Sequence, residues 1–274
     1  MTMLMNVALW LYRSQPSKTS VQAQRNRCFV RWLTAILLLL HSLAGLPAAR
    51  GSARSGPAMH TTSYHVAFWP LDEPAGSTVA GDLTGNGHYG TLSAGVTAGS
   101  AGPPTGDGTT SMAFHGADAV TVASMGGLPS GAHPYSLEAW VLPSAGGAAA
   151  QGLVGYGNYA ATRQAAYLRL AGATGLLHSW RNDDLAAAQT TSLTGTWHLA
   201  TASYDGHSRR LYLDGVPFAA DAPADVPNVQ LANLALGQTC CGGCLTGNTS
   251  RVLSDAYCPQ SRHQEARRAV LAWA

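Results

Sequence analysis

Two short segments carry the aromatic and polar side chains that a sugar-binding site requires. In one, Trp180 precedes Asn182 and Asp183, and in the other Tyr156 and Tyr159 flank a Gly-Asn pair. An aromatic face packs against the apolar face of a pyranose ring, and neighbouring amides and carboxylates can bond its hydroxyl groups. We therefore predict that Trp180, Asn182, Asp183, Tyr156 and Tyr159 contact a glycan, with ordinary exposed loop residues as the alternative interpretation.

A glycine-rich segment from Asp82 to Gly90 offers a second kind of chemistry. The carboxylate of Asp82, beside loop carbonyls and Asn86, would supply the oxygen ligands that Ca²⁺ prefers. The alternative is that Asp82 and Asn86 organise the turn through hydrogen bonds between their side chains and the backbone. Both interpretations remain open at the level of the sequence.

The chain lacks the paired carboxylates of a glycoside hydrolase. Its three glutamates are Glu73, Glu138 and Glu265, and none has a carboxylate two or four residues further on. Asp183 and Asp184 are adjacent, so on a strand their side chains would point to opposite faces. A nucleophile elbow of the Gly-x-Ser-x-Gly type is absent as well. We therefore predict a protein that is not an enzyme.

Four cysteines lie close together near the C-terminus, at Cys240, Cys241, Cys244 and Cys258. In a secreted chain an even number of cysteines indicates disulfides, and four cysteines allow three pairings. The adjacent Cys240 and Cys241 should pair with different partners, Cys244 and Cys258. A zinc site that combines Cys241, Cys244 and Cys258 with His263 is the alternative.

Short runs of alternating apolar and polar residues predict strands, and clusters of Gly, Pro, Asn and Asp separate them. Between Gly195 and Ala220, for example, the alternating runs end at Asp205-Gly206 and Asp214-Gly215, dipeptides that favour tight hairpin turns. The expected strands are Tyr64–Leu71, Met112–His115, Ala119–Ala123, Ser136–Leu142, Leu153–Tyr156, Ala166–Leu170, Leu176–Trp180, Leu199–Tyr204, Arg209–Leu213 and Ala232–Leu236. This pattern predicts an all-β fold, a jelly-roll sandwich of two antiparallel sheets.

Several sequence blocks carry a family resemblance. They are Val66 to Glu73, Asp82 to Gly90, Met112 to Gly116, Tyr135 to Pro143 and Thr196 to Gly215. In this order they resemble LamG-like jelly-roll domains of the concanavalin A-like lectin and glucanase superfamily, and they are also similar to pentraxin-like proteins. The resemblance implies a calcium site near Asp82. Together with the missing carboxylates, it favours a recognition module for carbohydrate or a glycosylated partner, with a glycoside hydrolase or a structural, adhesive domain as alternatives.

The resemblance ends near Gly237. Related domains close with a strand of the pattern Gly-x-Ile-Asp-Asp/Glu-Val-Arg-Ile-Tyr, and this chain departs from that pattern after Leu245-Thr246-Gly247. We therefore predict a jelly-roll domain over residues 64–245 and a divergent tail over residues 246–274, with a closing strand that is divergent or missing. The first strand would then lack a partner, and residues 250–274 would contribute little to stability.

The N-terminal segment has the order of charge and hydrophobicity of a secretory signal. Basic residues ending at Arg31 precede an apolar run from Trp32 to Leu46, and small residues follow. We expect a signal peptide or signal anchor over residues 1–49 and a linker over residues 50–63, with a transit peptide as the alternative. The protein would then be secreted or extracellular, or membrane-anchored by this segment. A glycan on Asn248, in the acceptor Asn248-Thr249-Ser250, would demonstrate secretion.

The charge of the central region argues against nucleic acid as a partner. Between Tyr64 and Gln238 there are twelve acidic residues and five arginines. Phosphate binding requires an excess of basic residues. Contact with a membrane would come only through an uncleaved N-terminal segment.

Overall fold

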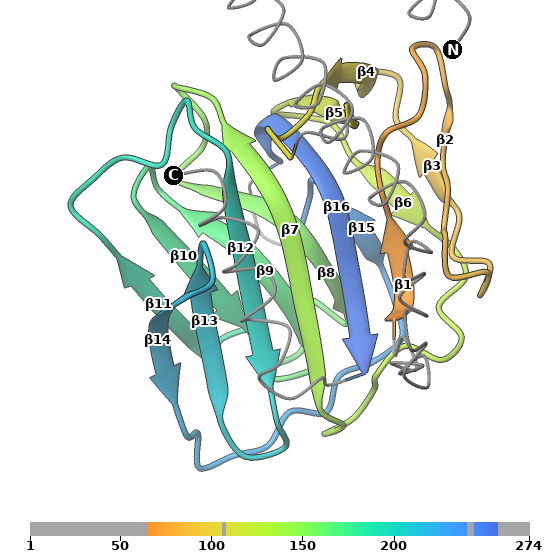
Figure 1. The fold of residues 1–274 in the computed structure, drawn as a ribbon. Coiled ribbons are helices and arrows are strands. Elements are labelled where there is room, and N and C mark those ends of the chain that lie inside the picture. The colour runs from red at the N-terminus through yellow and green to blue at the C-terminus, as the bar shows by residue number, and fades with distance from the viewer. Residues whose placement is uncertain (1–64, 106–107, 240–243, 257–274) are drawn as a thin grey trace, which may run out of the picture. The chain divides into compact units, whose positions relative to one another are not determined.

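Two antiparallel β-sheets stack as a sandwich (Figure 1). The computed structural model describes residues 65–105, 108–239 and 244–256, and these ranges contain no helix. The prediction of an all-β jelly roll with two antiparallel sheets is confirmed. In the part of the chain that is described, no helix is long and apolar enough to cross a membrane. The expected signal segment, residues 1–49, and the linker, residues 50–63, lie outside the described residues.

Sheet A contains eight strands, and its centre is the long strand β7. In order across the sheet they are β14 (Val216–Asp221), β13 (Arg209–Leu213), β12 (His198–Tyr204), β7 (Tyr135–Pro143), β16 (Thr246–Ala256), β5 (Thr110–His115) and β4 (Thr97–Ala101), with β1 (His65–Trp69) paired with β16. Buried and half-buried residues alternate along β7. One face of this strand therefore packs into the core, as the alternation in its sequence predicts.

Sheet B also contains eight strands. In order they are β11 (Asp184–Ala188), β10 (Gly175–Ser179), β9 (Ala165–Ala171), β8 (Ala150–Gly157), β15 (Leu234–Leu236), β6 (Val120–Val122), β3 (Gly90–Leu92) and β2 (Val79–Ala80). Side chains from both sheets form one continuous hydrophobic core, which includes Trp69, Phe114, Leu137 and Leu168. Burial of apolar surface, at about 25 cal/mol per Å², is the main term that stabilises such a sandwich.

Two-residue turns join neighbouring strands where the sequence predicts a hairpin. Asp214 and Gly215, between β13 and β14, have φ angles of 52° and 71°. Two positive φ angles in succession are the mark of a type I′ turn, which Asp-Gly favours. Arg181 and Asn182 have φ angles of 70° and 60° between β10 and β11. This second turn is less expected, because arginine rarely adopts positive φ.

The closing strand is present, so of the two predicted alternatives, a divergent or a missing strand, the structure shows the divergent one. β16 lies antiparallel to β7 along its length, to β5 at its first half and to β1 at its second half. The prediction that the first strand lacks a partner is therefore wrong, and sheet A extends past Leu245 into the segment expected to be a divergent tail. Backbone pairing does not require the side-chain pattern of related domains. A β-bulge between Ser250 and Leu253, with Arg251 at a φ of 49°, shifts the register. Val252, within the bulge, is fully buried.

Candidate functional site

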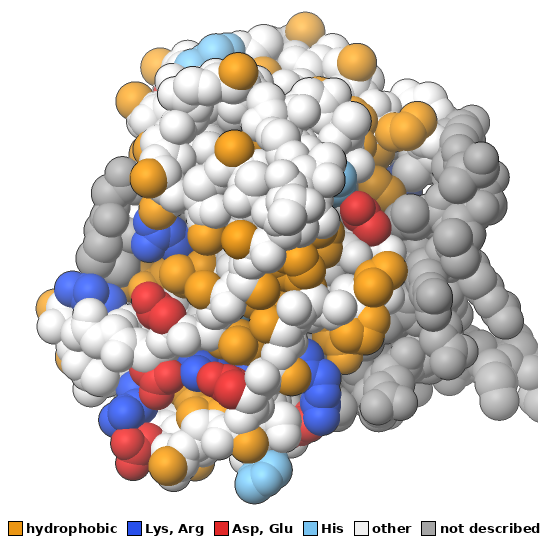
Figure 2. Space-filling view, turned by 90° about the vertical axis from the view of Figure 1, so that its left-hand side faces the viewer, with side chains coloured by type: hydrophobic (Ala, Val, Ile, Leu, Met, Phe, Trp, Pro, Cys, Tyr) orange, Lys and Arg blue, Asp and Glu red, His pale blue; other side chains and the backbone are white. Residues whose placement is uncertain are grey.

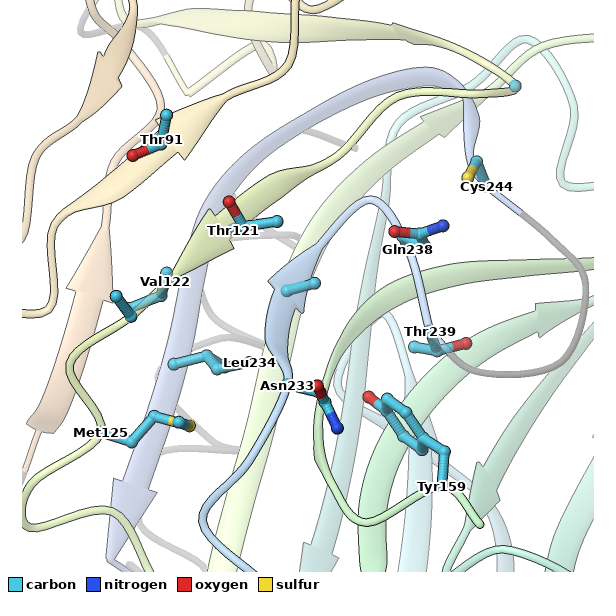
Figure 3. A pocket seen from close by; sticks show the side chains of 13 residues that line it. Thr91, Thr121, Val122, Met125, Tyr159, Asn233, Leu234, Gln238, Thr239 and Cys244 are labelled. Atoms are coloured by element: carbon cyan, nitrogen blue, oxygen red, sulfur yellow. The ribbon is translucent and has the colours of Figure 1, made fainter.

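A hollow of about 930 Å³ lies beside β3, β6 and β15 of sheet B (Figure 3). Five polar residues line it, namely Thr91, Thr121, Asn233, Gln238 and Thr239. All of them except Thr239 are exposed to solvent. A hollow of this size is typical of sites that bind small molecules.

The register of sheet B brings the floor of the hollow together. Thr91 lies opposite Thr121, and Thr121 lies opposite Ala235. Thr121 is exposed, whereas its neighbours Val120 and Val122 are buried in the core. Because successive side chains of a strand point to opposite faces, the two threonines lie on the face of sheet B that is turned away from sheet A.

The same row of residues continues across β8 to β9. Ala235 lies opposite Gly155, and Gly155 lies opposite Tyr167. A Cβ atom on Gly155 would lie 2.3 Å from the Cβ atom of Tyr167. The absence of a side chain at this position therefore allows Tyr167 to pack closely beside the hollow.

Tyr159 closes one end of the hollow. It comes from the loop after β8, which Asn158 organises by accepting a hydrogen bond from the backbone N–H of Ala160 at 3.0 Å. The Tyr159 ring meets the edge of the Tyr167 ring with centroids 5.9 Å apart. The guanidinium of Arg181 donates to the Tyr159 carbonyl oxygen at 2.7 Å. Tyr159 is therefore held at the rim in two ways. Its ring contacts Tyr167 of β9, and its backbone carbonyl binds Arg181.

Among the residues of the predicted glycan site, Tyr159, Asn182 and Asp183 lie near one another; their contact with a glycan stays a prediction. The loop of residues 158–164 packs against the β10–β11 turn. Asn182 Nδ2 donates to Thr162 Oγ1 at 3.1 Å, and Arg163 Nε donates to Asp183 Oδ2 at 2.8 Å. Asn182 is exposed, so its amide can reach a ligand beside the loop.

Trp180 and Tyr156 do not belong to this surface, and their predicted glycan contacts are corrected here. Both side chains are fully buried in the core. Trp180 Nε1 donates to the Tyr135 hydroxyl at 2.6 Å, and the Tyr156 hydroxyl donates to the Pro129 carbonyl at 2.8 Å. Each lies at an inward-facing position, which leaves no ring face for a sugar.

His178 completes the buried hydrogen bonds around Trp180. The Tyr135 hydroxyl accepts from Trp180, so its own proton points to His178 Nε2, 2.6 Å away. His178 is therefore neutral and carries its proton on Nδ1. Burial, together with the positive charge of Arg209, lowers the pKa of His178 to about 3.

Asp183 holds the structure together and is not available to a ligand. Its Oδ1 accepts from Arg209 Nη2 at 2.9 Å and its Oδ2 accepts from Arg163 Nε at 2.8 Å. Partial burial raises the pKa of Asp183, but the two arginines outweigh it and the pKa lies below its ordinary value. Arg209 also binds Asp221 and lies over the Trp180 ring, 4.3 Å from its centroid. On the face of the domain that carries β11 and β14, acidic side chains (red) and basic side chains (blue) lie next to one another (Figure 2).

The contacts of Asp82 are those expected if it organises the turn through hydrogen bonds to the backbone. Its carboxylate accepts hydrogen bonds from the backbone N–H groups of Phe68, Thr84 and His88 and from the Thr84 hydroxyl, at 2.7 to 3.2 Å. Burial raises the pKa of Asp82, but these hydrogen bonds outweigh it and the pKa is lowered. Asn86 Nδ2 donates to the Val66 carbonyl at 2.9 Å.

These contacts do not fit a calcium site built on Asp82, because hydrogen-bond donors of the chain already occupy its oxygens. Within the described residues there is no group of three His, Cys, Asp or Glu side chains that could hold a metal ion. Calcium binding stays a prediction.

The cysteine prediction falls mostly outside the described residues, which exclude Cys240, Cys241 and Cys258. Cys244 is a half-buried free thiol beside the hollow, and burial together with the charge of Asp118 raises its pKa. Asn248, the predicted glycosylation site, lies within β16, where its Nδ2 donates to Ser111 Oγ at 3.1 Å. Acceptor asparagines usually lie in surface loops, and this one lies in a central strand.

The described lining of the hollow is neutral. Among its described lining residues there is no Asp, Glu, Lys, Arg or His. Hydroxyl and amide groups both donate and accept hydrogen bonds, which suits a ligand rich in hydroxyl groups. The lining offers neither a pair of carboxylates nor a general base for hydrolysis.

Sequence reasoning missed most of the hollow. Thr91, Thr121 and Asn233 lie far apart in the chain, and only the strand order of sheet B brings them together. The alternation Val120-Thr121-Val122 did indicate an outward threonine. No signal in the sequence places β15 next to β6.

Comparison with known proteins agrees with the observed fold. Residues 114–246 match the family model described as the concanavalin A-like lectin/glucanases superfamily. This part of the chain is similar to that superfamily. The resemblance inferred from the sequence is therefore confirmed over these residues. A search of curated proteins gave no match.

Solved structures share the fold at low sequence identity. Domain 4 of AbnA, a GH43 extracellular arabinanase from Geobacillus stearothermophilus, was solved with arabinotriose; it aligns with a TM-score of 0.55 and 17% identity over 75% of this chain and 98% of that one. The ligand binding domain of botulinum neurotoxin serotype D, solved with N-acetylneuraminic acid, aligns with a TM-score of 0.53 and 11% identity over 76% of this chain and 51% of that one. Trypanosoma rangeli sialidase aligns with a TM-score of 0.53 and 11% identity over 77% of this chain and 33% of that one. Two of these neighbouring structures were solved with a carbohydrate ligand.

Proposed function

We propose that this protein is a non-catalytic, extracellular carbohydrate-binding module and that the hollow beside β3, β6 and β15 holds the glycan. The observation that carries the proposal is the lining of the hollow. Hydroxyl and amide side chains are exposed over a floor of small residues, and the hollow ends at an aromatic ring. The partner would be a polysaccharide or a glycosylated surface.

The polar residues would bind sugar hydroxyl groups. Thr91 and Thr121 lie opposite one another across two strands, so their hydroxyls can bond neighbouring positions of one ring. Asn233 and Gln238 add amide groups on the β15 side. Tyr159 would pack its ring against the apolar face of a sugar at the rim.

A non-catalytic role fits the residues that the hollow lacks. Hydrolysis of a glycosidic bond requires two carboxyl groups on either side of the scissile bond. Glu138, the one glutamate in the central strand of sheet A, accepts a hydrogen bond from Thr201 at 3.1 Å and does not line the hollow. A glycoside hydrolase is therefore the weaker candidate for this fold.

A glycan array with the full-length chain tests the proposal. We expect binding to at least one class of glycan, and about a fivefold loss of affinity in Tyr159→Ala, because an aromatic contact contributes about 1 kcal/mol. The matched control is Tyr89→Ala, since Tyr89 is 58% exposed and does not line the hollow. No release of reducing sugar from β-glucan, xylan or arabinan is expected.

Each outcome has a clear meaning. Loss of binding in both tyrosine variants would place the site elsewhere. Absence of binding to any glycan would leave the structural, adhesive role. Release of reducing sugar above a Glu138→Gln control would contradict the non-catalytic role.

A further inference from the structure

Arg169 is a buried cation next to the hollow. It belongs to β9, between Gly152 of β8 and Leu177 of β10. Its neighbours Leu168 and Leu170 are buried in the core, so Arg169 projects from the face of sheet B that is turned away from sheet A. Only 7% of Arg169 is exposed.

No described residue neutralises this guanidinium. Its Nε is buried without a hydrogen-bond partner, and no hydrogen bond or ion pair joins Arg169 to the described residues. Among the described residues, the side chain interacts with the Tyr167 ring, whose centroid lies 5.8 Å from Cζ. A buried charge is unfavourable unless it is paired and hydrogen-bonded.

Arg209 is a second buried arginine of this domain, and its charge is paired. The Arg209 guanidinium binds the carboxylates of Asp183 and Asp221, and its side chain is 2% exposed. Both arginines are buried and both lie beside an aromatic ring, but within the part of the chain that is described only Arg209 has anionic partners. The contrast indicates that the partner of Arg169 comes from outside the described chain.

A second unsatisfied polar group lies beside Arg169. Gly152, which lies opposite Arg169, has no side chain, and a Cβ atom there would lie 2.3 Å from the backbone nitrogen of Thr239. Thr239 lines the hollow, and its hydroxyl is buried without a hydrogen-bond partner. Arg169 and Thr239 therefore both lie beside Gly152, and Arg169 Nε and the Thr239 hydroxyl both lack a hydrogen-bond partner; of the two residues, Thr239 lines the hollow.

We propose that Arg169 binds the carboxylate of an acidic sugar unit, with the Thr239 hydroxyl as the second donor. The planar guanidinium matches a planar carboxylate, with which it can form two parallel hydrogen bonds. The neutral groups of the hollow would bind the hydroxyls of the same sugar or of the next unit. This inference rests on the proposed carbohydrate-binding function and specifies its ligand as a carboxylated glycan.

The test is a glycan array on which each neutral glycan has two matched partners, one with a carboxylate and one with a sulfate ester. The full-length chain should bind carboxylated members at least tenfold more tightly than their neutral partners.

Arg169→Met, which keeps the length and removes the charge, should abolish this preference and leave binding to neutral members unchanged. Arg169→Lys should lose most of it, because a lysine lacks the planar fork. Arg210→Met, at an arginine on sheet A, is the control and should behave as the wild type.

Thermal unfolding without ligand separates a binding role from a structural one. Arg169→Met should melt at or above the temperature of the wild type, because it removes an unpaired buried charge. A clearly lower melting temperature would mean that water or the chain itself holds the guanidinium, and it would overturn the proposal.

The array outcomes separate this inference from the proposed function. Equal binding of neutral and carboxylated members would overturn the inference and leave the carbohydrate-binding role intact. A preference for sulfated over carboxylated members would overturn the assignment of a carboxylate. Absence of binding to any glycan would overturn both.

Discussion

Trp69 in the first strand of the domain lies opposite Val252 in its last strand. Both side chains are fully buried in the core. The pair joins the two ends of the described chain in the middle of sheet A, where β16 also holds β7 and β5. The closure of the sandwich therefore depends on a segment whose sequence does not follow the pattern of related domains.

Deleting residues 250–274 should strongly destabilise the protein. The deletion removes Val252 from the core, leaves β1 without a partner strand, and leaves one end of β7 paired with β12 alone. Domains of this kind are stable by about 5–15 kcal/mol, so the loss of a central strand should lower the melting temperature by more than about 10 °C or abolish folding. Circular dichroism during heating measures the effect.

A chain that ends at Ala256 is the matched control, because it keeps every described strand. Its melting temperature should exceed that of the chain without residues 250–274 by the whole expected difference, more than about 10 °C. Equal melting temperatures for the two truncated chains would show that β1 and β16 do not pair in solution.

Local patterns predict the strands of this fold because alternation and turn dipeptides act over a few residues. The hairpin at Asp214-Gly215 is an example, since both the alternating flanks and the positive φ angles follow from its sequence. β16 was missed because the bulge at Ser250–Leu253 breaks the alternation that would reveal a strand. Pairing along a backbone tolerates this change of side chains.

The candidate site is harder to predict because it depends on register. Trp180 follows the last residue of a strand, and a shift of one residue decides whether its ring faces the core or the solvent. The sequence places it near a polar loop, and the structure places it against Tyr135 and Arg209. Tyr159 was predicted correctly to lie at a loop tip, because its Gly-Asn neighbours indicate a loop directly.

Acidification should destabilise the protein through His178. In the folded protein burial lowers the pKa of this residue to about 3, whereas an unfolded histidine has a pKa of about 6.5. Between these values the unfolded chain binds one more proton, so the free energy of unfolding falls as the pH falls. The slope is about 1.4 kcal/mol per pH unit, beginning near pH 6.5. Urea unfolding at pH 7, 6 and 5 measures it.

His178→Gln should reduce that slope by about one proton, while His207→Gln should leave it unchanged, because His207 is exposed. The lowered pKa values of Asp82 and Asp183 affect stability only near and below the ordinary aspartate pKa of about 4, so they do not contribute between pH 5 and 6.5. Identical slopes in the wild type and His178→Gln would contradict a neutral, buried His178.

Replacing Asp82 by alanine should destabilise the protein whether or not calcium is present. The carboxylate of Asp82 accepts hydrogen bonds from Phe68 in β1 and from Thr84 and His88 in the following loop. Alanine would leave these partly or fully buried N–H groups without an acceptor, at a cost of about 2–4 kcal/mol. Asp72→Ala, at an exposed carboxylate, should have little effect.

Melting temperatures in millimolar Ca²⁺ and in chelator decide the role of Asp82. If calcium raised the melting temperature of the wild type and of Asp72→Ala but not of Asp82→Ala, Asp82 would be a calcium ligand and its role as a pure turn residue would be wrong.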